Sequence, residues 1–307
     1  MPGGVVLGVA TAVSWGSADF LARFATRSVG SVRALFGMQF WGAIFVTILL
    51  FFARDWGHLF DGSGWQPWAW GILAGSINTF AMLALYRAFE IGKLSLVGPV
   101  SASYPAVTVI LSLLSGERLS AYRALGIIAA VLGVVFVAAG EKSSASVALS
   151  NESSDAITIP EKTSQVSGPR VSGLGWALAA AISFAILFWL LGIRMIPRTG
   201  ALATVWLIRV SGVLITLIVL LTKKVRLPVK DKRTRAQLYT MGYLDTAAFA
   251  LSNLGMRIEQ VAVVSVLGSL YGAVTVALAA IFLKERIAPL QWTGIAAIFL
   301  GVGLMNA

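Results

Sequence analysis

The sequence contains no cysteine and only one histidine among its 307 residues. Disulfide bonds, thiol catalysis and cysteine metal sites are therefore excluded, and zinc chemistry is not expected. The one histidine, His58, stands in a polar connection, so no Ser–His or Cys–His constellation is present and a membrane-embedded enzyme is disfavoured. No Gly-x-x-x-x-Gly-Lys-Ser/Thr motif occurs, so neither ATP nor any other cofactor is expected.

Charged residues are scarce as well, at 12% of the chain, where soluble proteins carry about 25%. Hydrophobic residues make up 58%, and the mean hydropathy is +0.85. A soluble fold has too little interior for so many apolar side chains, so lipid is the expected solvent. We therefore expect an integral, multi-pass protein of a bacterial-type plasma (inner) membrane. Residues 1–20 lack a basic start, so a cleavable signal peptide is not expected.

The net charge of +11 is unevenly distributed. Residues 223–235 contain seven Lys/Arg and one Asp, which places +6 in a single connection between apolar stretches. Such a basic loop is typical of the cytoplasmic side of a membrane protein, so nucleic acid is not an expected partner. Counting Lys and Arg in all connections puts both termini outside. The side of the termini nevertheless stays open.

Ten apolar stretches have about the 20 residues that a helix needs to cross the hydrocarbon. We therefore predict an all-α membrane protein with spans near residues 4–23, 31–53, 67–89, 93–115, 120–140, 173–195, 199–222, 238–256, 260–283 and 288–306. The longest connection, residues 141–172, is rich in serine and has no aromatic residue, so it is predicted to be a flexible polar linker. It separates a five-helix domain, 1–140, from a second one, 173–307.

The two halves resemble each other. Leu-Tyr-Gly-Ala-Val-Thr-Val at 270–276 follows the pattern of Ser-Tyr-Pro-Ala-Val-Thr-Val at 103–109, and a Glu-Arg pair follows in each half. A five-helix unit repeated in tandem enters the membrane in opposite senses, which is a recurring plan of secondary transporters. We therefore predict two inverted repeats with a binding site between them. The alternative is a duplicated bundle whose symmetry serves packing only.

Polar residues inside the membrane are costly unless they are paired or face water. Ser101, Tyr104 and Thr108 recur at helical spacing in the fourth stretch, and Tyr271 and Thr275 repeat the pattern in the ninth. These matching faces predict a shared, solute-binding cavity, with hydrogen bonding between helices as the alternative. The candidate cavity residues are Trp15, Asp19, Asn78, Ser101, Tyr104, Thr108, Arg209, Asp245, Asn253, Tyr271 and Thr275.

The charged candidates have alternatives of their own. Asp19 lies about 6 Å from the predicted end of its helix, close enough for its carboxylate to reach the headgroups. Arg209 and Asp245 are deeper and could pair with each other instead of contacting a solute. The acidic groups could also exchange protons, so a proton or coupling ion is considered as a partner beside a small-molecule solute and the bilayer.

Some residues point to bending and close packing. Pro99 and Pro105 lie in the fourth stretch, and Gly272 replaces Pro105 in the ninth, so both helices are predicted to bend near the midplane. These bends are hinge candidates or packing features. Gly126 and Gly133 form a small-residue face that we assign to helix packing or to a homodimer.

Taken together, these motifs resemble the EamA-type transporters of the drug/metabolite transporter superfamily. The residues that carry the resemblance are Trp15-Gly16-Ser17, Tyr104-Pro105, Gly-Glu-Arg-Leu at 116–119 and Lys-Glu-Arg-Ile at 284–287. The resemblance implies a ten-helix basket with a central cavity, alternating access, and efflux of amino acids or other metabolites by a permease. It also implies that both termini lie inside the cell, whereas the count of Lys and Arg in the connections puts them outside.

The chain departs from the family pattern close to the expected cavity. Ala18-Asp19 stands where Asn is usual, Gln39 where an arginine is frequent, and Gly272 where a proline is usual. The identity of the solute is therefore not carried over. Import of a sugar remains an alternative within transport, and a channel or structural membrane protein is the alternative from another class.

Overall fold

The computed structural model describes residues 2–56, 59–62, 64–92, 94–122, 124–129, 131–133, 135–136, 173–225, 229–283 and 289–306. All regular elements within these ranges are helices. They are α1 (Pro2–Val29), α2 (Ser31–Ala53), α3 (Gln66–Ile91), α4 (Leu94–Ser101), α5 (Pro105–Leu114), α7 (Leu174–Leu190), α8 (Ile196–Thr199), α9 (Ala201–Thr222), α10 (Lys232–Ile258), α11 (Val261–Ser269), α12 (Tyr271–Leu283) and α13 (Pro289–Asn306). A π-helical turn, Leu191–Met195, joins α7 to α8. The predicted linker 141–172 lies outside the described residues.

Within the described residues, six helical segments are long and apolar enough to cross a membrane. They are Gly3–Val29, Ser31–Ala53, Gln66–Ile91, Leu174–Thr199, Ala201–Thr222 and Val261–Phe282. The chain is thus an all-helical, multi-pass membrane protein. α10 is long enough but carries charges inside and at both ends, while α4 and α5 are short on their own. The count of ten spans stays a prediction.

Glycines at matching positions end and start the helices. α1 extends to Val29, six residues beyond the predicted end, because Ala22 and Ala25 continue its fully buried face. Gly30 then turns the chain with φ 83°, and Gly200 before α9 has the same φ. A side chain is strained at such positive φ, which explains why both turns use glycine.

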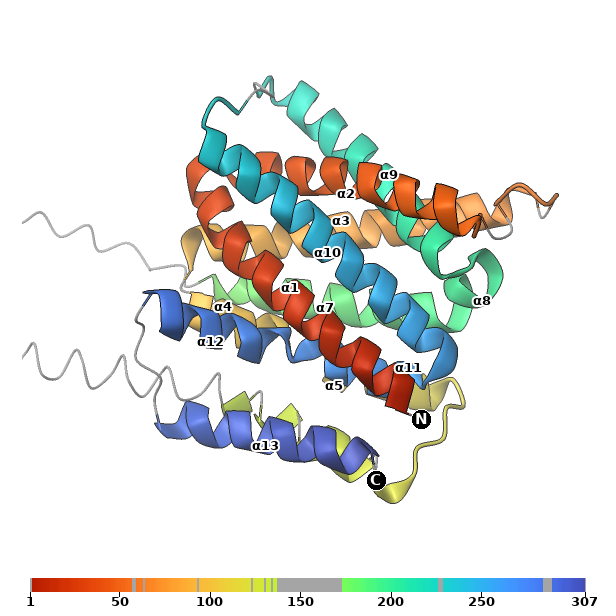
Figure 1. Ribbon diagram of the computed structural model, residues 1–307, viewed down its shortest axis with the longest axis vertical. Coiled ribbons are helices and arrows are strands. Elements are labelled where there is room, and N and C mark those ends of the chain that lie inside the picture. The colour runs from red at the N-terminus through yellow and green to blue at the C-terminus, as the bar shows by residue number, and fades with distance from the viewer. Residues whose placement is uncertain are drawn as a thin grey trace, which may run out of the picture.

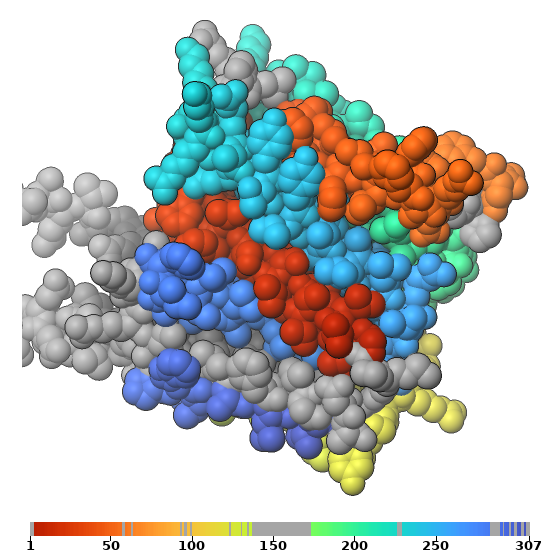
Figure 2. Space-filling model, in the orientation of Figure 1, coloured from red at the N-terminus to blue at the C-terminus, as the bar shows by residue number. Residues whose placement is uncertain are grey.

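The helix contacts obey an internal two-fold relation. The repeat relates α1, α2 and α3 to α7, α9 and α10. The contact of α1 with α10 thus corresponds to that of α7 with α3, and the contact of α2 with α10 corresponds to that of α9 with α3. The equivalent helices α2 and α9 pack on each other. In the same way α1 packs against α11 and α12, as α7 packs against α4 and α5. Figures 1 and 2 show α1 lying between α10 and α12 across the visible face. Two repeats of the same helix order therefore build one bundle around a common centre.

The fourth and ninth apolar stretches, which were predicted to bend, are both interrupted at this centre. α4 ends at Ser101 and α5 begins at Pro105, which has no N–H to continue the helical bonding. In the second repeat α11 ends at Ser269 and α12 begins at Tyr271. A Cβ on Gly272 would lie 2.9 Å from the Ala102 Cβ, so the two interruptions are in close contact. The other hinge candidate, Pro99, lies in α4, and its side chain is outside the described part of the chain.

Candidate functional site

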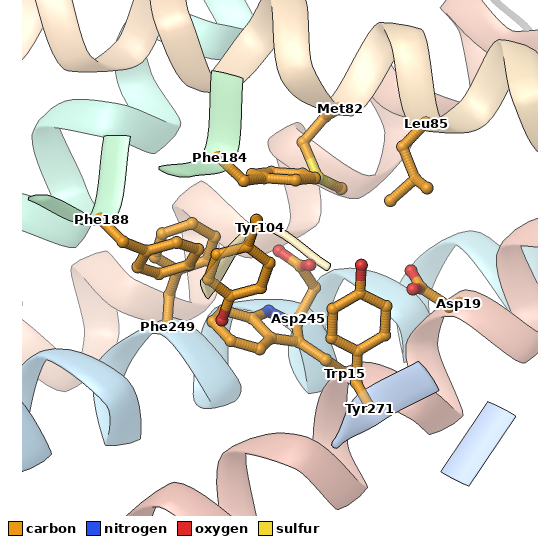
Figure 3. A pocket seen from close by; sticks show the side chains of 10 residues that line it. All are labelled: Trp15, Asp19, Met82, Leu85, Tyr104, Phe184, Phe188, Asp245, Phe249 and Tyr271. Atoms are coloured by element: carbon orange, nitrogen blue, oxygen red, sulfur yellow. The ribbon is translucent and has the colours of Figure 1, made fainter. Parts of the chain in front are cut away.

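A small cavity lies at the centre of the bundle, where both repeats contribute side chains (Figure 3). Its volume is ≈ 20 Å³, which is about what one water molecule needs. Its walls come from α1, α3, α7, α10 and α12 and from the break between α4 and α5. The lining residues are Trp15, Asp19, Met82, Leu85, Tyr104, Phe184, Phe188, Asp245, Phe249 and Tyr271.

The lining residues follow the internal symmetry. Thr108 Oγ1 donates to the Ala185 carbonyl at 3.4 Å, and Thr275 Oγ1 donates to the Gly16 carbonyl at 3.4 Å. These equivalent bonds set the register between α1 and α7. In this register the matched lining pairs are Trp15 with Phe184, Asp19 with Phe188, and Tyr104 with Tyr271. The cavity therefore lies on the pseudo-two-fold axis.

Both tyrosines line the cavity, and their hydroxyl groups tie the repeats together. Tyr104 donates to the Ser265 carbonyl at 2.9 Å, and Tyr271 donates to Ser101 Oγ at 2.8 Å. Each bond crosses from one repeat to the other. The rings face the cavity, whereas the hydroxyl protons are already used, so the tyrosines present mainly aromatic surface to a solute.

One end of the cavity is an aromatic box (Figure 3). Tyr104 stacks on Phe188 with ring centroids 4.9 Å apart, and Phe188 stacks on Phe249 at 5.9 Å. Trp15 meets Phe188 edge-on at 5.5 Å and Phe249 at 5.3 Å. Each such pair contributes about 0.5–1.5 kcal/mol beyond simple burial, so the box is a rigid apolar wall.

Behind this wall lies a buried ion pair. A guanidinium nitrogen of Arg209 donates to the Asp245 carboxylate, and Arg209 Nη1 donates to Gln39 Oε1 at 2.9 Å. The guanidinium carbon also lies 5.0 Å from the centroid of the Phe249 ring. Arg209 is completely buried and does not line the cavity, whereas Asp245 does.

Asp19 is the second carboxylate of the cavity, at the end away from the box (Figure 3). It is 5% exposed and lies ten residues before the end of α1, about 15 Å along the helix at 1.5 Å per residue. The helix continues beyond its predicted end, so Asp19 lies farther from the helix end than the sequence predicted. Arg209 pairs with Asp245, whereas no ion pair of Asp19 is found among the described residues.

The other predicted residues are buried but do not line the cavity. Ser101, Thr108 and Thr275 take part in the hydrogen bonds between helices described above. Asn253 donates to the Ala201 carbonyl at 3.1 Å. The amide group of Asn78 has no hydrogen-bond partner among the described residues.

Five lining residues have no polar group and were missed by a search for polar side chains. They are Met82, Leu85, Phe184, Phe188 and Phe249. The repeat was the signal that could have found two of them, because it aligns the predicted residue Trp15 with Phe184 and the predicted residue Asp19 with Phe188.

Comparison with known proteins agrees with this architecture. The EamA-like transporter family matches residues 2–139 and 171–307, one match for each repeat. The chain belongs to the EamA-like transporter family. No curated protein matches it. A solved structure entitled "Crystal structure of protein" shares its fold with a TM-score of 0.66 at 17% identity, covering 98% of this chain and 95% of that one.

Membership in a transporter family gives the cavity a context. The EamA-like repeat unit occurs twice, and the cavity lies where the two copies meet. The sequence resemblance to this family is thereby confirmed, and a membrane transport role follows from it. The solute and the direction of transport do not follow from membership alone.

Proposed function

We propose that this EamA-like protein is a secondary transporter that moves a small organic metabolite by alternating access through the central cavity. The observation that carries the proposal is the position of the cavity on the pseudo-two-fold axis, with matched walls from both repeats. Inverted repeats place their solute at such an interface and expose it to each side in turn. The interruptions between α4 and α5 and between α11 and α12 supply local flexibility next to the site.

The solute that fits best carries an amine. Asp19 is a buried carboxyl group with no ion pair among the described residues, because Arg209 pairs with Asp245, and an ammonium group would be a matching partner for it. The aromatic box at the other end would hold an apolar or aromatic body. We therefore place amino acids and related amines first, with efflux as the proposed direction. A proton on Asp19 would serve the same electrostatic purpose in the empty state.

A sugar is the weaker candidate. Sugars stack on aromatic faces but also need several free hydrogen-bonding groups around them. The hydroxyl protons of Tyr104 and Tyr271 already bind Ser265 and Ser101, which removes two of the expected donors. The remaining wall is mostly apolar. A neutral polyol would leave the Asp19 charge uncompensated.

The test is transport by the purified protein in proteoliposomes, with radiolabelled amino acids, simple amines and sugars as probes. We expect counterflow of an amine-bearing probe, and at least tenfold weaker binding of it to Asp19→Asn. Asp55→Asn is the matched control, because it removes the same charge outside the helices. Sugar counterflow with unchanged activity of Asp19→Asn would contradict the amine assignment, and no counterflow of any probe would count against transport through this cavity.

A further inference from the structure

A second and larger cavity lies at the end of the bundle where α2 begins and where α3 and α9 end. Its volume is ≈ 590 Å³, within the range of roughly 300–1,000 Å³ that ligand sites occupy. We call it the basic pocket. The lining residues that matter here are Arg33, Phe80, Arg87, Glu90, Trp176 and Lys223.

The charges of the basic pocket do not balance. Glu90 Oε2 lies 3.1 Å from Arg87 Nη1 and accepts the Ser31 N–H at 3.3 Å, so Arg87 and Glu90 form a pair. Arg33 and Lys223 remain as two further positive charges on the wall. Arg33 Nε is buried and has no hydrogen-bond partner among the described residues. A buried donor beside unpaired cations calls for an anionic acceptor.

The basic pocket lies at the level of lipid headgroups. Arg87 is in the last turns of α3, Lys223 directly follows α9, and Arg33 is in the first turn of α2. Trp176 stands near the start of α7 and is 41% exposed, as is typical of tryptophans at a membrane interface. The pocket is therefore placed where a headgroup can reach it from the bilayer.

An apolar path leads from the basic pocket toward the membrane centre. On α3, Leu83 and Phe80 precede Arg87 at helical spacing, and both line the pocket. Phe80 is 53% exposed, and Leu73 farther along the same helix is 45% exposed. A soluble anion would leave this path unused, whereas an acyl chain would cover it.

We propose that the basic pocket binds the headgroup phosphate of an anionic phospholipid, with Arg33 and Lys223 as the phosphate contacts and an acyl chain along Phe80. Basic pockets between transmembrane helices on the cytoplasmic side are suited to such headgroups. The site is separate from the central cavity and does not depend on which solute the protein moves.

The test is native mass spectrometry of the full chain in detergent, titrated with dioleoyl phosphatidylglycerol or dioleoyl phosphatidylcholine. We expect one retained phosphatidylglycerol, bound at least tenfold more tightly than phosphatidylcholine. Arg33→Gln and Lys223→Gln should each weaken phosphatidylglycerol binding about fivefold and leave phosphatidylcholine unchanged. Lys223 is exposed, so its variant provides the measurement even if Arg33→Gln does not fold.

Arg257→Gln is the matched control, because this exposed arginine ends α10 at the opposite side of the bundle. An equal loss of phosphatidylglycerol in Arg257→Gln would mean that overall charge attracts the lipid, and the proposal would fail. It would also fail if the unmodified protein did not distinguish the two lipids. Displacement of phosphatidylglycerol by millimolar glycerol 1-phosphate would assign the pocket to a soluble anion and overturn the lipid assignment.

Discussion

Replacing Asp245 by asparagine removes one charge of the buried ion pair and keeps its shape. Arg209 is fully buried and Asp245 is 2% exposed, so water cannot take over the role of the lost carboxylate. Removing one partner of such a pair costs about 3–5 kcal/mol. Arg209 keeps its bond to Gln39 and its position over Phe249, so we expect the lower end, a loss of about 3 kcal/mol.

The first repeat suggests the compensating change. Gln39 and Asn78 occupy the positions that Arg209 and Asp245 hold in the second repeat, as the matching glycines three residues after or before them indicate. The double variant Arg209→Gln, Asp245→Asn therefore gives both repeats the same neutral pair. We expect it to regain most of the stability lost in Asp245→Asn, because no unpaired charge remains buried.

The assay is equilibrium unfolding in mixed detergent–SDS micelles, with Asp55→Asn as the control for a charge lost outside the helices. A loss below about 1 kcal/mol in Asp245→Asn would refute the reasoning, because a surface pair costs that much. A double variant no more stable than the single one would refute it as well. A stable double variant that no longer binds solute would show that Asp245 also contacts the solute, which separates the two roles left open by the sequence.

Two further predictions concern the tyrosine walls and the start of α10. Tyr104→Ala and Tyr271→Ala should each reduce proteoliposome transport severalfold while the protein still inserts into the membrane. Tyr122→Ala is the control, because Tyr122 is exposed. Normal transport by both cavity variants would contradict a role of the tyrosines in the cavity. Asp231 caps α10, and its pKa is lowered by hydrogen bonds from the Thr234 hydroxyl and N–H. This stabilisation is present above the unfolded pKa of about 3.9 and lost as pH falls through the lower folded pKa. Amide exchange in the first turn of α10 should therefore lose protection below about pH 4 and in Asp231→Ala, and unchanged protection in the variant would exclude the cap.

Helices and the repeat were predictable because their signals are periodic. Apolar stretches of membrane length predicted multiple helices, and the Tyr/Thr pattern of 103–109 and 270–276 predicted two related halves. Both tyrosines do line the cavity. The helix ends were less predictable, because α1 continues through polar residues wherever its alanine face still has a partner to pack against.

The site itself was only partly predictable, for a physical reason. A polar residue in a membrane helix must find a partner, but the sequence does not say whether that partner is a solute or another helix. Asn253 binds a backbone carbonyl and Thr275 binds another helix, although both met the same criterion as Tyr271. Conversely, Phe184 and Phe188 face the cavity without any polar signal.

The two repeats share a backbone plan but not a charge distribution, and this difference bears on mechanism. Asp19 of the first repeat lines the cavity, and the corresponding residue of the second repeat is Phe188. Likewise the neutral Gln39 of the first repeat corresponds to Arg209 of the second. When inverted repeats exchange conformations, the cavity opens to opposite sides of the membrane in turn. The two backbone states can then be related by the pseudo-two-fold axis, while Asp19 stays on α1 and Phe188 stays on α7. The two repeats are therefore alike in fold but present different groups to the cavity, a carboxyl group from α1 and an aromatic ring from α7.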